Sequence, residues 1–362
     1  MGFKCGIIGL PNVGKSTLFN ALTKSEIPAE NFPFCTIDPN VGKVPLPDSR
    51  LIELNKIVNS KRIIPAALDL VDIAGLVKGA SDGEGLGNAF LSNIREMTAL
   101  AHVVRCFEDQ NITHVDGSVN PKRDVEVINL ELILSDLETV TKRIAKCEKL
   151  IKTNDKNNKI QLEILLLIQK DLENGQLINL KNFTEDEQKI IKSFQLLSSK
   201  PMFFIGNIND SEQSKKYIEQ LNEVAKELNT FVIPVSIKIE HEISTLEEEE
   251  KKEYLEVMGL DEPILNKIIL EGYKMLGLKT FFTAGPNEIR AWTIKDGFTA
   301  PNAAGVIHTD FERGFIKAEV IDFKDYIVNG GELGARENGK LRLEGKEYIV
   351  QDGDVIHFKF NV

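Results

Sequence analysis

Residues 9–17 constrain the fold more than any other part of this chain. They fit the pattern G-x-x-x-x-G-K-[ST], and the apolar residues 3–8 before them predict a strand. Glycines let the backbone curl so that consecutive N–H groups point at one phosphate, and the following helix adds its positive end. We therefore expect Lys15 to reach the β and γ phosphates of a nucleoside triphosphate, and the Ser16 hydroxyl to hold Mg²⁺. The loop residues predicted to bind the nucleotide are Asn12, Val13, Gly14, Lys15, Ser16 and Thr17.

Two later segments predict the rest of a metal and γ-phosphate site. Residues 67–75 read as a strand that ends in D-x-x-G, so that Asp72 can hold Mg²⁺ through water and the Gly75 N–H can contact the γ phosphate. Residues 31–36 form a Pro-containing stretch whose Thr36 stands where a first switch loop would close over the metal. Thr36 is therefore the second predicted protein ligand of Mg²⁺, the alternative being an ordinary loop threonine.

The residue after Gly75 departs from the pattern of Ras-like hydrolases. Those proteins carry a glutamine there to orient the attacking water, whereas this chain has Leu76, which cannot do so. Five glycines between positions 75 and 87 suit a second switch that orders only around a triphosphate. Either hydrolysis is slow, or another group places the water.

Recognition of the base is expected where a later strand, near residues 202–207, ends. The nearest match to N-K-x-D begins at Asn207, with Ile208 in place of the lysine and Asp210 in the last position. The Asn207 amide carries both a donor and an acceptor and can bind adenine or guanine. A carboxylate at Asp210 matches the donor pair of guanine. A further strand over 231–236 ends at Ser236, where a backbone contact to the base is expected.

Taken together, these segments resemble the Obg-like ATPase (YchF) family of P-loop GTPase-like proteins, over the whole chain. The resemblance rests on residues 6–20, 31–40, 72–80, 305–312 and 350–355. It implies an ATPase that depends on Mg²⁺, and association with the 50S subunit or the whole ribosome. It also implies a catalytic histidine in place of the missing glutamine, which carries over onto His114. By itself, a histidine in a polar loop is usually solvated and idle.

One position separates this chain from the pattern of that family. The family's base motif usually ends in glutamate, N-x-x-E, whereas this chain has Asp210. The missing lysine at Ile208 favours ATP, and the aspartate favours GTP. The adenine contacts implied by the resemblance are the Asn207 side chain and the backbone at Ile208.

The pattern along the chain predicts an α/β protein. Residues 1–125 and 200–277 are expected to form a P-loop GTPase-like G domain, interrupted over 126–199 by an inserted α-helical hairpin or coiled coil. Residues 278–362 alternate short strands with turns and predict a β-grasp-like domain that resembles TGS domains. Helical spacing marks the hairpin at Leu130, Leu134, Leu137, Val140, Ile144, Ile160, Ile164, Leu167 and Leu172. Residues 289–294, 315–320, 348–350 and 355–360 are predicted strands of the last domain.

Charge and composition narrow the partners. The net charge of −11 argues against general binding to DNA or RNA. The hairpin is a local exception, because residues 142–159 carry seven basic and two acidic side chains; Lys142 to Lys159 could contact ribosomal RNA, or be an ordinary solvated surface. We find no long apolar run and no signal-like start, and expect a soluble cytoplasmic protein without membrane contact. The cysteines, of which Cys5 and Cys106 lie in strand-like runs, show no metal-ligand spacing.

Three functions fit these observations. The first is a ribosome-associated ATPase that acts as a nucleotide-dependent switch, in which His114 and Lys15 are catalytic. The second is a GTPase of the same fold, which Asp210 favours. The third is a nucleotide-gated binding protein with negligible turnover, which Leu76 favours. A metabolic kinase fits less well, because no pocket for an acceptor substrate is recognisable.

Overall fold

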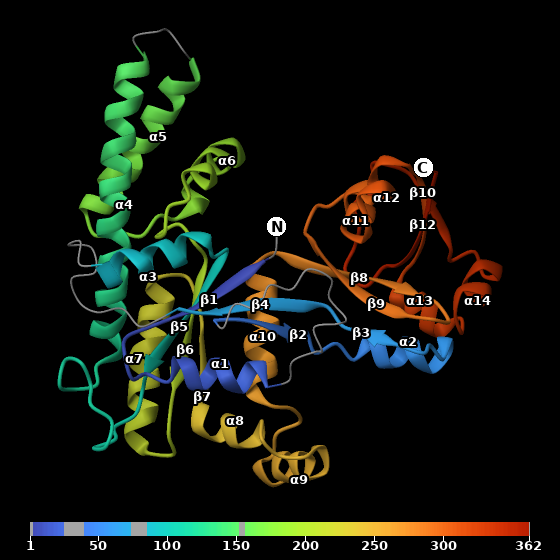
Figure 1. The fold of residues 1–362 in the computed structure, drawn as a ribbon, viewed down its shortest axis with the longest axis horizontal. Coiled ribbons are helices and arrows are strands. Elements are labelled where there is room, and N and C mark those ends of the chain that lie inside the picture. The colour runs from blue at the N-terminus through green and yellow to red at the C-terminus, as the bar shows by residue number, and fades with distance from the viewer. Residues whose placement is uncertain (1–2, 25–39, 74–84, 152–155, 362) are drawn as a thin grey trace. The chain divides into compact units, whose positions relative to one another are not determined.

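The computed structural model describes residues 3–24, 40–73, 85–151 and 156–361 (Figure 1). It is an α/β protein with two compact units. The first unit contains Met1–Leu22, Pro39–Val41 and Leu70–Lys251, and the second contains Thr23–Asp38, Gly42–Asp69 and Lys252–Val362. Thr36, Gly75 and Leu76, all named above, lie outside the described residues. The domain boundaries proposed from sequence remain predictions.

The first sheet has the strand order β2-β4-β1-β5-β6-β7 within the described residues. The pairs β1 with β5, β5 with β6 and β6 with β7 are parallel. Every residue of β5 is buried, as expected for a parallel strand covered on both faces. The strands are β1 (Lys4–Ile8), β2 (Val41–Pro45), β4 (Ala67–Asp72), β5 (Ala99–Arg105), β6 (Met202–Asn207) and β7 (Val232–Val235).

Helices connect these strands in the α/β manner. The α1 helix begins directly at the lysine of the phosphate loop and buries Leu18, Phe19 and Leu22. The other helices that accompany this sheet are α3 (Gly85–Glu96), α7 (Glu212–Glu227) and α8 (Ile237–Ile243), and α1 itself spans Lys15–Thr23.

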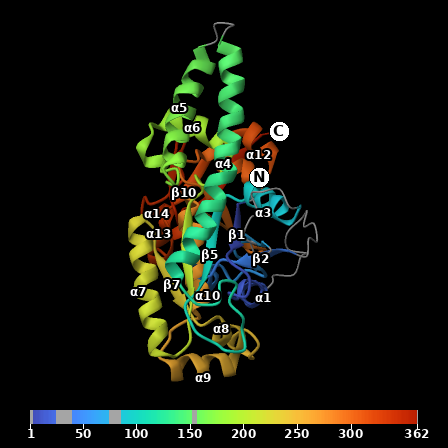
Figure 2. The same cartoon turned by 90° about the vertical axis from the view of Figure 1, so that its left-hand side faces the viewer.

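The inserted helical hairpin is confirmed. Helices α4 (Pro121–Ile151) and α5 (Lys156–Glu173) lie side by side and project beyond the sheet of their unit, with α6 (Glu185–Phe194) near their base (Figures 1 and 2). Val140, Ile144, Ile164 and Leu172 lie in the shared core of these helices. Other members of the predicted stripe are exposed at the surface, namely Leu130, Leu134, Ile160 and Leu167. The spacing therefore identified the helices but not which of their faces is buried.

The base of the hairpin is held by one buried carboxylate. Asp136 in α4 accepts hydrogen bonds from the backbone N–H groups of Leu197 (2.9 Å) and Ser198 (2.7 Å). The Ser198 hydroxyl donates a third, at 2.6 Å. Burial raises the pKa of Asp136, and these three donors oppose that rise. The contact fixes α4 to the chain segment that returns to β6.

The second unit contains the predicted β-grasp arrangement. Its sheet has the order β11-β10-β12-β8-β9-β3 within the described residues. The strand pairs β8 with β9, β10 with β12 and β10 with β11 are antiparallel, whereas β12 and β8 are parallel. The strands are β3 (Ile63–Ile64), β8 (Leu278–Ala284), β9 (Ile289–Lys295), β10 (Phe315–Ile321), β11 (Arg342–Glu344) and β12 (Val355–Phe360).

Short helices accompany this sheet. Buried alanines of α11 and aromatic residues of the strands form one core, which includes Ala303, Phe281 and Phe358. The helices of the second unit are α2 (Arg50–Val58), α10 (Ile264–Met275), α11 (Ala300–Ile307), α12 (Thr309–Arg313), α13 (Phe323–Val328) and α14 (Glu332–Glu337). Helix α9 (Glu248–Met258), which begins in the acidic run, overlaps the boundary between the units.

One predicted strand of this unit is wrong. Residues 348–350 form a single bridge, between Thr299 and Ile349, and no strand. The cause is that their backbone is hydrogen-bonded to the start of α11 and the residues before it. The Ala300 N–H donates to the Tyr348 carbonyl oxygen, and the Val350 N–H donates to the Phe298 carbonyl oxygen. The strand that pairs with β10 is instead the charged segment Arg342–Glu344, which lacks an apolar alternation.

No helix in the described ranges has both the length and the apolar composition needed to cross a bilayer.

Candidate functional site

The phosphate loop connects β1 to α1 and adopts a backbone that requires glycine at two positions. Gly9 has φ +149° and Gly14 has φ +104°. A Cβ atom at Gly9 would lie 2.4 Å from the Val103 carbonyl oxygen, and one at Gly14 would lie 2.8 Å from Asn207 Nδ2. Neither contact is sterically possible without a shift. The glycines thus keep the loop close to the ends of β5 and β6, where a phosphate chain can lie along backbone N–H groups.

Lys15 is held inside this loop. Its Nζ donates to the Leu10 carbonyl oxygen at 2.7 Å, and the residue is only 7% exposed. Burial lowers the pKa of the Lys15 ammonium to about 8, although the negative charge of Asp72 opposes the change. A buried ammonium bonded to one neutral carbonyl oxygen is poorly compensated. A polyphosphate would provide the negative partners that this site lacks.

The residues expected to hold Mg²⁺ fit a hard cation. Asp72 ends β4, and its buried Oδ1 has no hydrogen-bond donor among the atoms that the structure describes. Ser16 is exposed in the first turn of α1, with its hydroxyl on the same loop as Lys15. Oxygen ligands of this kind, completed by phosphate oxygens and water, suit Mg²⁺. The structure does not describe Thr36 or Gly75, so their roles stay predictions.

Asn207 ends β6 and is bonded to two other parts of the site. Its Nδ2 donates to the Val13 carbonyl oxygen at 2.9 Å, and its Oδ1 accepts from the Ile237 N–H at 3.2 Å. The side chain is buried and supports the phosphate loop. One amide hydrogen and one oxygen lone pair remain for a base. This second role was not part of the sequence prediction.

The other predicted base contacts, Ile208, Ser236 and Asp210, have fewer hydrogen bonds to the rest of the site than Asn207. The Ile208 N–H donates to the Val235 carbonyl oxygen, so that only its own carbonyl group is left for a base. Ser236 precedes α8 as its N-cap residue, with no hydrogen bond from its side chain to the helix. Asp210 is exposed, and its carboxylate has no partner among the described residues. These three positions leave both adenine and guanine open.

The His114 side chain is buried and hydrogen-bonded through both ring nitrogens. Its imidazole is 6% exposed; Nε2 lies 3.0 Å from Asp124 Oδ2, and Nδ1 accepts from the Asp116 N–H at 3.2 Å. This pattern fits a neutral ring whose Nε2–H donates to Asp124. Burial raises the pKa of Asp124, while the bonds from His114 and Arg123 lower it. With both ring nitrogens occupied, His114 can act on a water molecule only after one of these bonds opens.

Arg105, at the end of β5, organises the loop that carries His114. Its guanidinium donates to the carbonyl oxygens of Phe107 (3.0 Å), Ile112 (3.0 Å) and Asp109 (3.2 Å). It also lies over the Phe107 ring, 4.7 Å from its centre, and burial lowers its pKa. The sequence analysis did not identify this residue. The available signal was an arginine at the end of a strand that is otherwise apolar except for His102.

The same loop touches the phosphate loop. Asn12, with φ +62°, donates from Nδ2 to the Thr113 carbonyl oxygen at 3.3 Å. Residue 113 directly precedes His114 in the sequence. The backbone next to His114 is therefore bonded to the phosphate loop, while the imidazole is bonded to Asp124 at the start of α4.

Three features define a P-loop nucleotide-binding protein. They are a phosphate loop that requires glycines before a helix, a buried lysine, and an aspartate at the end of the neighbouring strand β4, one oxygen of which is buried without a donor among the described residues. A family model described as a 50S ribosome-binding GTPase matches residues 4–130. A model of the C-terminal domain of YchF GTPases, described as a protein of unknown function, matches residues 278–361. The chain belongs to the YchF family.

Relatives and a solved structure agree over the full length. A protein of Haemophilus ducreyi named ribosome-binding ATPase YchF is 54% identical over 363 residues, which cover 100% of both chains. The protein of that name from Bacillus subtilis is 52% identical over 366 residues, again with 100% of both chains. The structure of the Schizosaccharomyces pombe YchF GTPase aligns with a TM-score of 0.86 and 38% identity, covering 99% of this chain and 98% of that one.

Proposed function

We propose that this chain hydrolyses ATP as a nucleotide-dependent switch that binds the ribosome. One observation supports nucleotide binding most directly: the buried Lys15 ammonium follows β1 and Asp72 ends the neighbouring strand β4, and Asp72 Oδ1 is buried without a donor among the described atoms. The names of the full-length relatives, ribosome-binding ATPases, support the nucleotide and the partner. A ribosome-bound protein would act in the cytoplasm.

Residues of the phosphate loop and of the two switch segments would bind the phosphates and Mg²⁺. Lys15 leaves the Leu10 carbonyl oxygen and binds the β and γ phosphates, where it stabilises the charge of the transferring group. Ser16, Thr36 and, through water, Asp72 hold Mg²⁺, which when bound neutralises phosphate charge. The Gly75 N–H contacts the γ phosphate. These are the interactions that would order both switch segments around ATP and release them after hydrolysis.

His114 would replace the glutamine that Leu76 does not supply. Opening of the Asp116 N–H bond frees Nδ1 as an acceptor for a proton of the attacking water, while Asp124 still holds Nε2–H. Asp124 then stabilises the imidazolium that forms. If this rearrangement does not occur, the protein is a nucleotide-gated binding protein with little turnover. Release of phosphate, measured with and without ribosomes, separates these two functions, because the gate gives none in either case.

A GTPase is the second candidate, and Asp210 favours it. The carboxylate is exposed and unpartnered within the described structure, and it could pair with the N1 and N2 donors of guanine. Calorimetric titration of the nucleotide-free protein with Mg²⁺ and non-hydrolysable ATP or GTP analogues decides between the bases. Tighter binding of the ATP analogue supports the proposal. The choice of base is overturned if the GTP analogue binds more tightly and Asp210→Ala abolishes that preference. The exposed control Asp261→Ala should keep the preference.

The hairpin is the proposed contact for ribosomal RNA. Lys146, Lys149 and Lys159 are exposed, as is Lys142, which is ion-paired with Glu138. Arg143 serves packing instead, because its guanidinium lies 5.0 Å from the centre of the Phe194 ring and bonds to the Phe194 carbonyl oxygen. The basic surface available to phosphates is thus smaller than the sequence count suggests.

A further inference from the structure

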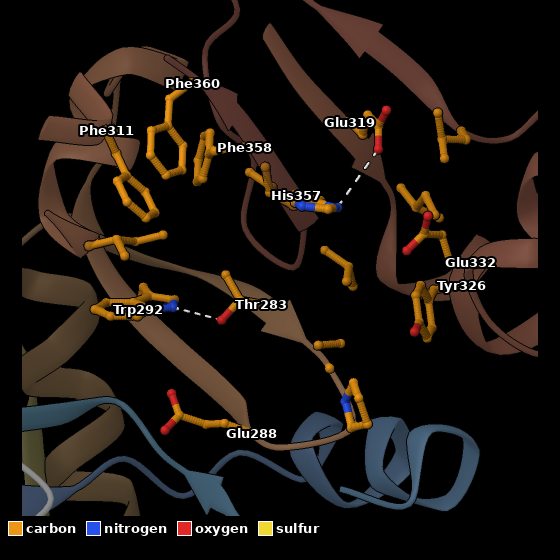
Figure 3. A pocket seen from close by; sticks show the side chains of 18 residues that line it. Thr283, Glu288, Trp292, Phe311, Glu319, Tyr326, Glu332, His357, Phe358 and Phe360 are labelled. Carbon is orange, nitrogen blue, oxygen red and sulfur yellow. Dashed lines mark hydrogen bonds and ion pairs between the residues drawn. The ribbon is translucent and has the colours of Figure 1, made fainter. Parts of the chain in front are cut away.

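In the sheet of the second unit, the central strands β8 and β12 separate from each other along part of their length. β8 and β12 are paired in parallel at one position, Phe282 with Val355. Beyond that position a cavity of about 650 Å³ lies between them (Figure 3). Its walls come from the ends of β8 and β9, from β12, and from the helices on both sides of the sheet. A cavity of this size accommodates a ligand of several residues or a drug-sized molecule.

The cavity exposes strand edges. The Phe282 N–H of β8 donates to the Asp354 carbonyl oxygen, and the Asn361 N–H donates to the Gly314 carbonyl oxygen on the side of β10. Main-chain groups alternate in direction along a strand, so those of Phe358 and Phe360 face the side of β8. No strand in the described part of the chain pairs with that edge beyond Val355. Likewise, Ala284 lies beyond Phe282, the last residue of β8 that pairs with β12, and faces the same gap. Unpaired edges of this kind accept an added strand.

The two ends of the cavity differ in chemistry. Trp292, Phe311, Phe358 and Phe360 gather at one end, and the Phe311 and Phe360 rings stack with centres 3.8 Å apart (Figure 3). Glu319 and Glu332 stand at the other end, whereas Glu288, the third carboxylate of the lining, stands on the same side as Trp292 (Figure 3). The lining therefore offers an apolar surface for one set of side chains and an anionic surface for another.

The charged side chains that line the cavity are carboxylates. Glu319 and Glu332 occupy the end opposite the aromatic cluster, and the lining contains no lysine or arginine. Basic groups already lie beside both carboxylates: Lys359 (3.4 Å), His357 (3.8 Å) and Arg336 (3.9 Å) are near Glu319, and Arg336 lies 2.9 Å from Glu332. Because a carboxylate accepts up to about four hydrogen bonds, these pairs leave capacity for a further cation.

We propose that this cavity binds an extended peptide of a partner protein, in which apolar and basic side chains alternate. The peptide would lie between β12 and β8 as an added strand and bond to the free edges of both. Successive side chains of a strand point to opposite faces. Phe358 pairs with Ala318, and His357 pairs with Glu319, so Phe358 and Glu319 lie on opposite faces of the sheet. The apolar set would therefore lie on the face of Phe358, and the basic set on the face of Glu319. This site is separate from the phosphate loop and does not depend on the proposed ATPase activity.

Trp292 gives a direct measure of occupancy, because it is the single tryptophan of the chain and lines the cavity. The probe is an acetylated and amidated hexapeptide of alternating lysine and valine, titrated into the full-length protein without nucleotide. We expect a saturable change in tryptophan emission at micromolar peptide. Two control peptides are needed: alternating glutamate and valine, and three lysines followed by three valines. An equal response to either control, or no response to the probe, overturns the proposal.

Two variants separate side-chain from main-chain recognition. The double variant Glu319→Gln, Glu332→Gln should weaken the probe at least about tenfold, whereas Glu337→Gln, on the same helix as Glu332 but outside the lining, should not. Ala284→Pro removes a donor from the free edge and no bond to β9, and should also weaken binding. Circular dichroism and a thermal melt establish that each variant is folded. Unchanged affinity in both the double variant and Ala284→Pro contradicts strand addition at this site.

A second copy of the chain is the competing occupant. If it fills the cavity, tryptophan emission and sedimentation will change with protein concentration in the absence of peptide, and the probe will compete with self-association. That result would overturn the proposal of a partner peptide in favour of self-association through the cavity. A concentration-independent monomer that responds to the probe supports the proposal.

Discussion

Asn207 Nδ2 donates a 2.9 Å hydrogen bond to the carbonyl oxygen of Val13, a residue 194 positions earlier in the chain. The bond joins the end of β6, where the base is expected, to the loop that is expected to hold the phosphates. Gly14, the next residue, approaches the same amide so closely that a Cβ atom would clash with it. The residues predicted to recognise the base and the phosphates are therefore in direct contact.

Replacement of Asn207 should cost stability as well as binding. Asn207→Ala leaves the Val13 carbonyl and the Ile237 N–H without partners in a buried site, which costs about 1–3 kcal/mol. Urea unfolding of the nucleotide-free protein measures the loss. Asn266→Ala, which removes an exposed bond to Glu262, should change stability by less than about 0.5 kcal/mol. Equal losses in both variants would show that Asn207 acts only as a surface side chain.

The phosphate-loop lysine should destabilise the nucleotide-free protein. Burial lowers the pKa of Lys15 to about 8 from the ordinary 10.5. The unfolded chain then binds the proton more tightly, so that the free energy of unfolding rises as the pH increases from 8 to 10.5, by at most about 3 kcal/mol. Lys15→Met should remove that rise and stabilise the protein at pH 7, while abolishing turnover. Chemical unfolding at several pH values tests this, and an unchanged rise in the variant would assign it to other groups.

His114 should matter for turnover and not for affinity. His114→Ala removes the group proposed to act on water, and we expect phosphate release to fall about 10²-fold or more, with the dissociation constant of the ATP analogue within about threefold. Single-turnover phosphate release and calorimetry measure the two quantities. His308→Ala, at an exposed histidine of the second unit, is the matched control. Unchanged turnover in His114→Ala removes this residue from the mechanism.

Arg105 should act by positioning the His114 loop. Arg105→Met breaks three bonds to the carbonyl oxygens of that loop, so we expect both lower turnover and a shifted His114 ring signal in the NMR spectrum. Arg105→Lys keeps the charge but cannot reproduce the planar donors of a guanidinium, and should restore little. A normal His114 signal with normal turnover in Arg105→Met would contradict this role.

The exposed hairpin lysines should contribute to ribosome binding. Lys146→Glu with Lys149→Glu reverses two charges, so that binding in a sedimentation assay should weaken and depend less on salt. Lys189→Glu with Lys192→Glu makes the same change on α6 and serves as the control. Equal effects of the two pairs would indicate only an effect of net charge.

The sequence determined the features that depend on local chemistry. The phosphate loop could be predicted because Gly9 and Gly14 are needed for the loop's own backbone conformation, wherever the rest of the chain lies. The strands β1, β4, β6 and β7 of the first sheet followed from apolar runs, whereas β2 was not predicted, and the hairpin followed from helical spacing. The order of these segments and the family resemblance then predicted the α/β fold and the β-grasp arrangement of the second unit.

Only the tertiary structure decided how distant residues share their hydrogen bonds. Asn207 supports Val13, and Arg105 holds the loop that carries His114, because parallel strands bring their ends together at one edge of the sheet. The exposure of Leu130 and the absence of a strand at 348–350 depend on which neighbours supply burial and backbone partners. The separation of β8 from β12, and the cavity between them, likewise depends on strand pairing over long distances, which local pattern does not encode.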